Sequence, residues 1–187
     1  MRRLPTLLLL ALAGLASAAE SRPNIIFILA DDLGYGEVGF MGQKKILTPN
    51  LDRLAQEGLV LTRHYCGSPV CAPSRSVLMT GLNPGRAPVR DNLDVGKGEQ
   101  IPLPTGITTL PNVLRQAGYA TGAFGKWGLG GYDSTGRPDV QGFDKFLGLT
   151  SQWVAHSHYP PAIWEDGKEV PLDNGEKGVP GHGGFPT

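Results

Sequence analysis

Residues 24–36 read NIIFILADDLGYG, and this stretch decides the fold class because an apolar run ends abruptly at two carboxylates. The run from Asn24 to Ala30 is short, continuous and rich in β-branched residues. Such a run, bounded by turn residues, is typical of a strand buried on both faces of a parallel sheet. Asp31 and Asp32 then follow the carboxyl end of that strand, which is the edge where open α/β sheets bind ligands.

Helix and strand patterns alternate along the rest of the chain. Three helices are predicted by the same signals, a threonine or proline at the start and a glycine at the end. They cover residues 48–58, 73–81 and 108–118. Further strands are predicted at residues 59–64 and 119–124, and a hairpin at residues 162–172 around Asp166-Gly167. This alternation predicts an α/β fold with a largely parallel sheet flanked by helices.

Charge and the first residues limit the class of protein. The 17 basic and 17 acidic side chains cancel, so no nucleic-acid partner is expected. Residues 1–19 combine two arginines, a short apolar run and small residues, which is typical of a secretory signal peptide; a buried core helix is the alternative. We expect an exported protein, periplasmic or extracellular, whose residues 20–187 keep no membrane attachment after cleavage, because no second long apolar run follows.

The chain contains two cysteines, Cys66 and Cys71, in HYCGSPVCAPSR. In an exported protein a disulfide between them is one interpretation. The other depends on Pro73, which suits the first turn of a helix and places Cys71 beside the helix N-terminus. Free N–H groups there, together with the guanidinium of Arg75, favour a thiolate or a bound oxyanion.

Three further groups of polar residues are candidates for a site. Asp31 and Asp32 are hard oxygen ligands that suit Ca²⁺ or Mg²⁺, although two turn acids are also common without a metal. Lys126 follows the strand predicted at residues 119–124 and could pair with an oxyanion, or be a surface lysine. His156 and His158 lie close together in WVAHSHYP, where a structural role is the simpler interpretation.

Taken in order, four segments carry a resemblance to a known family. They are RPNIIFILADDLGYGEVG, TPNLDRLAQEG, SPVCAPSRSVLMTG and AGYATGAFGKWGLG. The chain resembles the type I sulfatases of the alkaline-phosphatase-like superfamily over nearly all of residues 22–165. The most specific part is Cys-x-Pro-Ser-Arg at residues 71–75, which in this family is recognised by the enzyme that converts the cysteine to formylglycine.

The resemblance implies a reaction and a role for each candidate residue. Cys71 would become formylglycine, hydrated to a geminal diol that attacks the sulfur of a sulfate ester, either an aryl sulfate or a sulfated carbohydrate. Asp31, Asp32 and an oxygen of the modified Cys71 would hold Ca²⁺ rather than Mg²⁺. Arg75 would steady this region, and Lys126 would contact both diol and sulfate. The implied partner is a formylglycine-generating or other sulfatase-maturing enzyme.

The chain departs from the family pattern in two ways. Gly128 stands where many members have a histidine that contacts the formylglycine, and our hypothesis is that His156 replaces it from another loop. Members also run to several hundred residues, so we expect residues 20–187 to be the N-terminal part of a catalytic domain that is incomplete at its C-terminal side. Such a chain is not expected to turn over substrate alone.

Two other functions stay open from the sequence. A phosphonate or phosphate ester hydrolase could use the same scaffold and the same cysteine motif. A non-catalytic secreted fragment held by a Cys66–Cys71 disulfide is the alternative from another class.

Overall fold

The computed structural model describes residues 22–93, 95 and 100–174. The predicted signal peptide, residues 1–19, lies outside the described residues. The chain divides after Leu54 into two compact units, which are described separately below. No helix in the described ranges is long and apolar enough to cross a membrane.

The N-terminal unit is built around the start of a helix. Its elements are the short 3₁₀ helices η2 (Tyr35–Glu37) and η3 (Gly39–Met41) and the first part of α2 (Pro49–Glu57). Gly39 N donates to Thr48 Oγ1 at 2.7 Å, and Phe40 N donates to Asp52 Oδ1 at 2.7 Å. These bonds tie η3 to the first turn of α2, because Thr48 and Asp52 lie on either side of its start.

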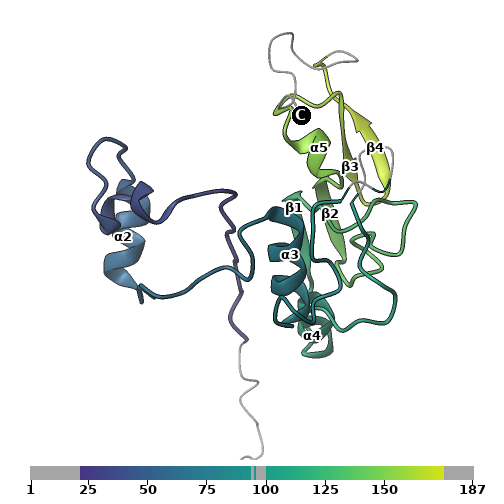
Figure 1. Ribbon diagram of the computed structural model, residues 1–187, viewed down its shortest axis with the longest axis horizontal. Coiled ribbons are helices and arrows are strands. Elements are labelled where there is room, and N and C mark those ends of the chain that lie inside the picture. The colour runs from purple at the N-terminus through teal and green to yellow at the C-terminus, as the bar shows by residue number, and fades with distance from the viewer. Residues whose placement is uncertain (1–21, 94, 96–99, 175–187) are drawn as a thin grey trace, which may run out of the picture. The chain divides into compact units, whose positions relative to one another are not determined.

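The C-terminal unit contains one four-stranded sheet in the order β1-β2-β3-β4 (Figure 1). Its elements are α3 (Cys71–Thr80), α4 (Leu110–Gln116), β1 (Gly122–Lys126), β2 (Lys145–Leu149), α5 (Gln152–Ala155), β3 (Ala162–Glu165) and β4 (Lys168–Pro171). The α/β class is confirmed. The sheet is mixed in the described residues, since β1 and β2 are parallel whereas β2–β3 and β3–β4 are antiparallel.

The core of this unit packs around β2, α3 and the segment that follows β1. Its buried members are Ala72, Val89, Leu103, Trp127, Leu129 and Phe146. Trp127 is the largest of them, and its ring meets Phe143 edge-on at 5.8 Å between centroids. An edge-to-face pair of this kind adds about 1 kcal/mol beyond the area it buries. The residue that follows β1 is therefore held firmly.

The three predicted helices are confirmed. Helix α3 begins two residues earlier than predicted, at Cys71, and ends at Gly81, which has a φ of 66°. Only glycine adopts this left-handed conformation at little cost. The hairpin is also confirmed, with Asp166 and Gly167 at φ 46° and 86° between β3 and β4. Positive φ at both central residues is the requirement of a type I′ turn.

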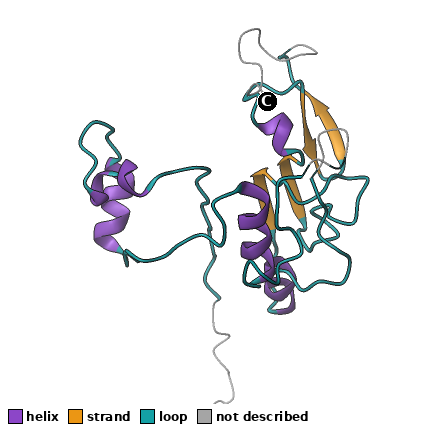
Figure 2. Ribbon diagram, viewed as in Figure 1, coloured by secondary structure: helices purple, strands orange, loops and turns teal. Residues whose placement is uncertain are grey.

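Two strand predictions are wrong. Residues 24–30 and 59–64 form no strand in the part of the chain that the structure describes, and Figure 2 draws both as loop. Ile26 and Ile28 are 86% and 80% exposed. A parallel strand is defined by hydrogen bonds to neighbouring strands, so an apolar run with no paired neighbour stays extended without becoming a strand.

The strand predicted at residues 119–124 forms three residues later, as β1. Thr121 explains the shift, because its main chain and hydroxyl both bind Asp144 Oδ2, at 2.8 and 3.0 Å, instead of entering the ladder. The bond from the Thr121 N–H is the main reason that the pKa of Asp144 lies below its ordinary value. The delayed start carries the strand through to Lys126, which becomes its last residue.

Candidate active site

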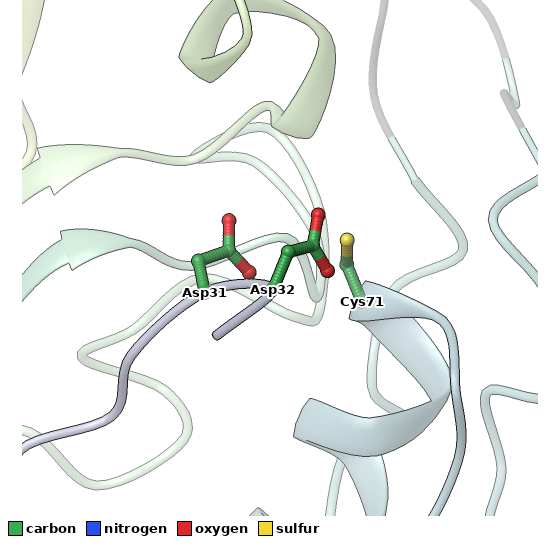
Figure 3. A group of neighbouring side chains, drawn as sticks. All are labelled: Asp31, Asp32 and Cys71. Carbon is green, nitrogen blue, oxygen red and sulfur yellow. The ribbon is translucent and has the colours of Figure 1, made fainter. Parts of the chain in front are cut away.

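Cys71 is the first residue of α3 and is half-buried. Figure 3 shows its side chain leaving the N-terminal turn of that helix. The first intrahelical bond runs from Ser74 N to Val70 O at 3.0 Å. Pro73 fits the same turn because its missing N–H has no partner to lose there. The sequence thus places the sulfur beside the positive end of the helix dipole.

Lys126 lies at the carboxyl end of β1, and its ammonium group reaches Cys71. The Nζ–Sγ distance is 3.3 Å. Trp127, the next residue, is anchored by its main-chain N–H to Leu149 O at 2.9 Å and by its indole N–H to Gly136 O at 2.8 Å. Because Trp127 is fixed in the core, the backbone that carries Lys126 has little freedom to move away from Cys71.

His156 joins these two residues from a third element. Its Nε2 lies 3.4 Å from Lys126 Nζ. His156 caps the C-terminus of α5, a single turn whose start is fixed by Ser151 Oγ accepting from Val154 N at 3.2 Å. The structure therefore brings Cys71, Lys126 and His156 together from α3, β1 and α5, although 85 positions separate the first from the last.

Arg75 contacts the same region through the backbone. Its guanidinium donates to the main-chain carbonyl of Lys126. Arg75 lies one turn after Cys71 on α3, so this bond joins the helix that carries the cysteine to the strand that carries the lysine. A planar guanidinium suits this task because its donors keep a fixed direction.

Asp31 and Asp32 belong to the N-terminal unit, and both are exposed. Figure 3 shows their carboxylates on one side of the segment that carries them. Asp32 has a φ of 57°, a left-handed conformation that costs a non-glycine residue about 1 kcal/mol or more. Strain of this kind concentrates at binding and catalytic residues. The adjacent carboxylates form an oxygen-only donor pair, which is the chemistry that a hard cation requires.

Both cysteines are free thiols in the structure. Cys66 is exposed, and its sulfur lies 3.1 Å from the carbonyl oxygen of Ser68. Cys71 instead faces Lys126. The disulfide that the sequence left open is therefore not formed, and the sulfur of Cys71 is available for chemistry.

Asn92 is a site residue that the sequence did not reveal. Val70, the N-cap residue of α3, has no side-chain oxygen to accept a bond from the first turn of the helix. Asn92 supplies that acceptor from outside the helix, with Ala72 N donating to its Oδ1 at 2.9 Å. No local pattern predicts this cap, because the two residues are 20 positions apart.

Replacing Asn92 with alanine is expected to lower the free energy of unfolding by about 1 kcal/mol, the usual cost of a lost helix cap. Urea unfolding followed by circular dichroism measures it. Asn92→Asp is the matched control, because a carboxylate oxygen still accepts from Ala72 N and is favoured at a helix N-terminus. Equal losses in the two variants would show that the cap contributes nothing.

The chain is similar to known sulfatases in sequence and in structure. The model of the family described as Sulfatase matches residues 23–178. Human steryl-sulfatase is 41% identical over 157 residues, and human arylsulfatase A is 43% identical over 180 residues. A solved structure of BT4656 in complex with its substrate D-glucosamine-2-N,6-O-disulfate is 33% identical and superposes with a TM-score of 0.66.

These matches cover most of this chain but a minor part of each relative. They include 79%, 87% and 81% of the chain for steryl-sulfatase, arylsulfatase A and BT4656. The same matches cover 27%, 33% and 28% of those proteins. The chain thus spans about a quarter to a third of the length of the relatives.

Proposed function

The chain belongs to the sulfatase family, and from this premise we propose that it supplies the nucleophile side of a site that hydrolyses sulfate esters. The observation that carries the proposal is the position of Lys126 Nζ, 3.3 Å from Cys71 Sγ at the start of a helix. An ammonium group beside the positive end of a helix dipole stabilises a bound sulfate and the charge that develops on it during transfer.

Cys71 acquires its reactive form by modification. A formylglycine-generating or other sulfatase-maturing enzyme recognises Cys-x-Pro-Ser-Arg at residues 71–75 and supplies the oxidant that converts the thiol to an aldehyde. The free thiol of Cys71 supports this proposal. Residues 1–19 act as the export signal, residues 20–187 form the N-terminal part of the catalytic domain, and the mature protein is periplasmic or extracellular.

Hydrolysis then proceeds in two displacement steps on the hydrated aldehyde. One hydroxyl of the geminal diol attacks the sulfate ester sulfur, the S–O bond to the alcohol breaks, and the alcohol leaves with a proton. The second hydroxyl then loses its proton, the carbonyl bond forms again, and the C–O bond to sulfate breaks. Lys126 stabilises the charge on sulfate, and His156, 3.4 Å from Lys126, takes part in moving the proton in the second step.

A divalent cation fits the donor set. Asp31 and Asp32 offer two adjacent carboxylates, and modification would change the atom at position 71 from sulfur to oxygen. We propose that these three residues hold the cation, and that Ca²⁺ suits them better than Mg²⁺, because Ca²⁺ accepts irregular oxygen coordination. When bound, the cation supplies Lewis acidity that favours ionisation of the attacking hydroxyl.

The relatives support a substrate class. Their printed names include an arylsulfatase and a steryl-sulfatase, and BT4656 binds a sulfated glucosamine. We propose an aryl sulfate or a sulfated carbohydrate as the substrate of this protein.

Because this chain is not expected to turn over substrate alone, the test uses a completed protein, in which the chain is joined to the C-terminal part of a full-length sulfatase. Made in a host with a formylglycine-generating enzyme, the completed protein is expected to release phenol from an aryl sulfate faster than from the matching aryl phosphonate ester. Lys126→Met is expected to lower kcat for the sulfate by about a hundredfold or more, the usual cost of removing one donor to developing charge. Absorbance of the released phenolate measures both. Lys145→Met is the matched control, since Lys145 lies at the start of β2 and pairs with Asp166. Preference for the phosphonate would instead support the alternative ester hydrolase.

A further inference from the structure

Gly128, two residues after Lys126, has no room for a side chain. Its φ is 72°, and a Cβ atom built there would lie 2.6 Å from Gln152 Cγ and 2.7 Å from Gln152 Nε2. Its main-chain N–H is already bonded to Thr150 O at 3.0 Å, so the turn cannot easily shift. The side chain of Gln152 therefore occupies the space that any residue other than glycine would need at position 128.

Gln152 is almost fully buried, with 3% of its surface exposed. Both its main-chain N–H and its side-chain amide have hydrogen-bond acceptors nearby. Its main-chain N–H donates to Gln100 Oε1 at 2.9 Å. Its side-chain amide lies 3.4 Å from two acceptors, Gly128 O and Asn92 Oδ1. Asn92 Oδ1 also accepts from Ala72 N, next to Cys71. Gln152 is thus connected both to the turn after Lys126 and to the start of α3.

Gln152 and His156 stand at the two ends of one helical turn. Gln152 begins α5 and His156 caps it four residues later, so the two share one face of the turn. The main chain confirms this spacing, since His156 N donates to Gln152 O at 3.1 Å. Fixing the side chain of Gln152 against Gly128 and Asn92 therefore fixes the direction in which His156 approaches Lys126, where the Nε2–Nζ distance is 3.4 Å.

The amide of Gln152 is poorly arranged for stability alone. Two contacts of 3.4 Å are longer than ordinary N–H···O hydrogen bonds. Its Oε1 is buried and has no hydrogen-bond partner among the described residues. Burying an unsatisfied acceptor is unfavourable, so an apolar side chain of the same length would fill this space equally well or better. A role in orienting neighbouring residues explains why a polar side chain stands at position 152. The two weak hydrogen bonds from its amide to Asn92 and Gly128 still have a preferred direction.

We propose that Gln152 is a positioning residue that holds His156 beside Lys126. It does so from the space that a side chain at position 128 would otherwise occupy. The inference rests on the proposed function only where it gives His156 a part in hydrolysis. That Gln152 holds His156 beside Lys126 can be tested without any turnover.

The test replaces Gln152 with methionine, which keeps the length of the side chain and removes its amide. Nitrogen-15 NMR of the imidazole reports the environment of His156, and circular dichroism reports stability. We expect Gln152→Met to keep its melting temperature within a few degrees while the His156 Nε2 signal shifts or broadens. Trp153→Ala is the matched control, because Trp153 is on the same helix turn but is 51% exposed; its His156 signal should match wild type.

An unchanged His156 signal in folded Gln152→Met would overturn the proposal. Should that variant fail to fold, Gln152→Leu also removes the amide, with a slightly smaller side chain and no added charge, and the His156 signal of this variant decides the question. In the completed protein that carries formylglycine at position 71, Gln152→Met is expected to lower kcat for an aryl sulfate by up to about a hundredfold. KM should change little, as for a misplaced catalytic group. A shifted His156 signal in Gln152→Met, together with no hydrolase activity in the completed protein that carries formylglycine at position 71, would contradict the proposed function while supporting the role of Gln152.

Discussion

Replacing Cys71 with alanine in the completed protein, in which this chain is joined to the C-terminal part of a full-length sulfatase, is expected to abolish sulfate ester hydrolysis. The expected fall in kcat is on the order of a million-fold, as when other enzymes lose their nucleophile. The reason is that alanine cannot be converted to an aldehyde, so no diol forms beside Lys126. Release of phenolate from an aryl sulfate measures the loss. Circular dichroism should be unchanged, because Cys71 is half-buried at a helix start and alanine favours helices.

Two further variants sharpen this prediction. Cys71→Ser keeps one hydroxyl, which can attack sulfur but cannot expel sulfate, so the variant should gain a stable sulfate ester at position 71 in a single turnover. Cys66→Ser is the matched control, because Cys66 is exposed and bonds only to its own loop in the described structure. Full activity in Cys71→Ala, or loss of activity in Cys66→Ser with Cys71 intact, would contradict the assignment of the nucleophile.

Replacing Gly148 with alanine is expected to have a large effect on stability. Gly148 pairs with Gly125 across β1 and β2, and a Cβ atom at position 148 would lie 1.9 Å from Gly125 O. The backbone of β2 fixes the position of the Cβ atom, and the backbone of β1 fixes the carbonyl oxygen, so neither can rotate away. The strands would have to separate one residue before Lys126, and we expect a loss of about 4 kcal/mol or more, at which the unit fails to fold.

Expression yield and thermal unfolding measure this effect. Gly85→Ala is the matched control in the same unit, because a Cβ atom there would lie 3.4 Å from a single side-chain atom, Asn83 Oδ1. A Gly148→Ala protein that melts at the wild-type temperature would show that the pairing of β1 with β2 is not as described.

The helices could be predicted from the sequence because their signals are local. Pro111 in the first turn of α4 and Gly81 at the end of α3 act on their own turns, so neighbouring residues decide the outcome. Strands depend on partners elsewhere in the chain. The apolar run at residues 24–30 has the composition of a strand, yet in the described structure it has no sheet neighbour, and composition alone cannot reveal that.

The residues of the candidate site also differ in whether the sequence could predict them. Lys126 and Cys71 could be expected together, because one follows a strand, the other begins a helix, and the family pattern links them. Asn92 and Gln152 could not, since each acts through a hydrogen bond to a residue 20 or more positions away. The glycine at position 128 was a visible departure from the family pattern. The side chain of Gln152, which fills the space beside that glycine, is visible only in the folded chain.

The most direct measurement of the central claim is the mass of one tryptic peptide. Cleavage after Arg63 and Arg75 releases HYCGSPVCAPSR, residues 64–75, which contains both cysteines. From a host with a formylglycine-generating enzyme, we predict a peptide in which Cys66 keeps its thiol and position 71 carries an aldehyde that reacts with hydrazide. A peptide that retains sulfur at position 71 in every molecule would contradict the account.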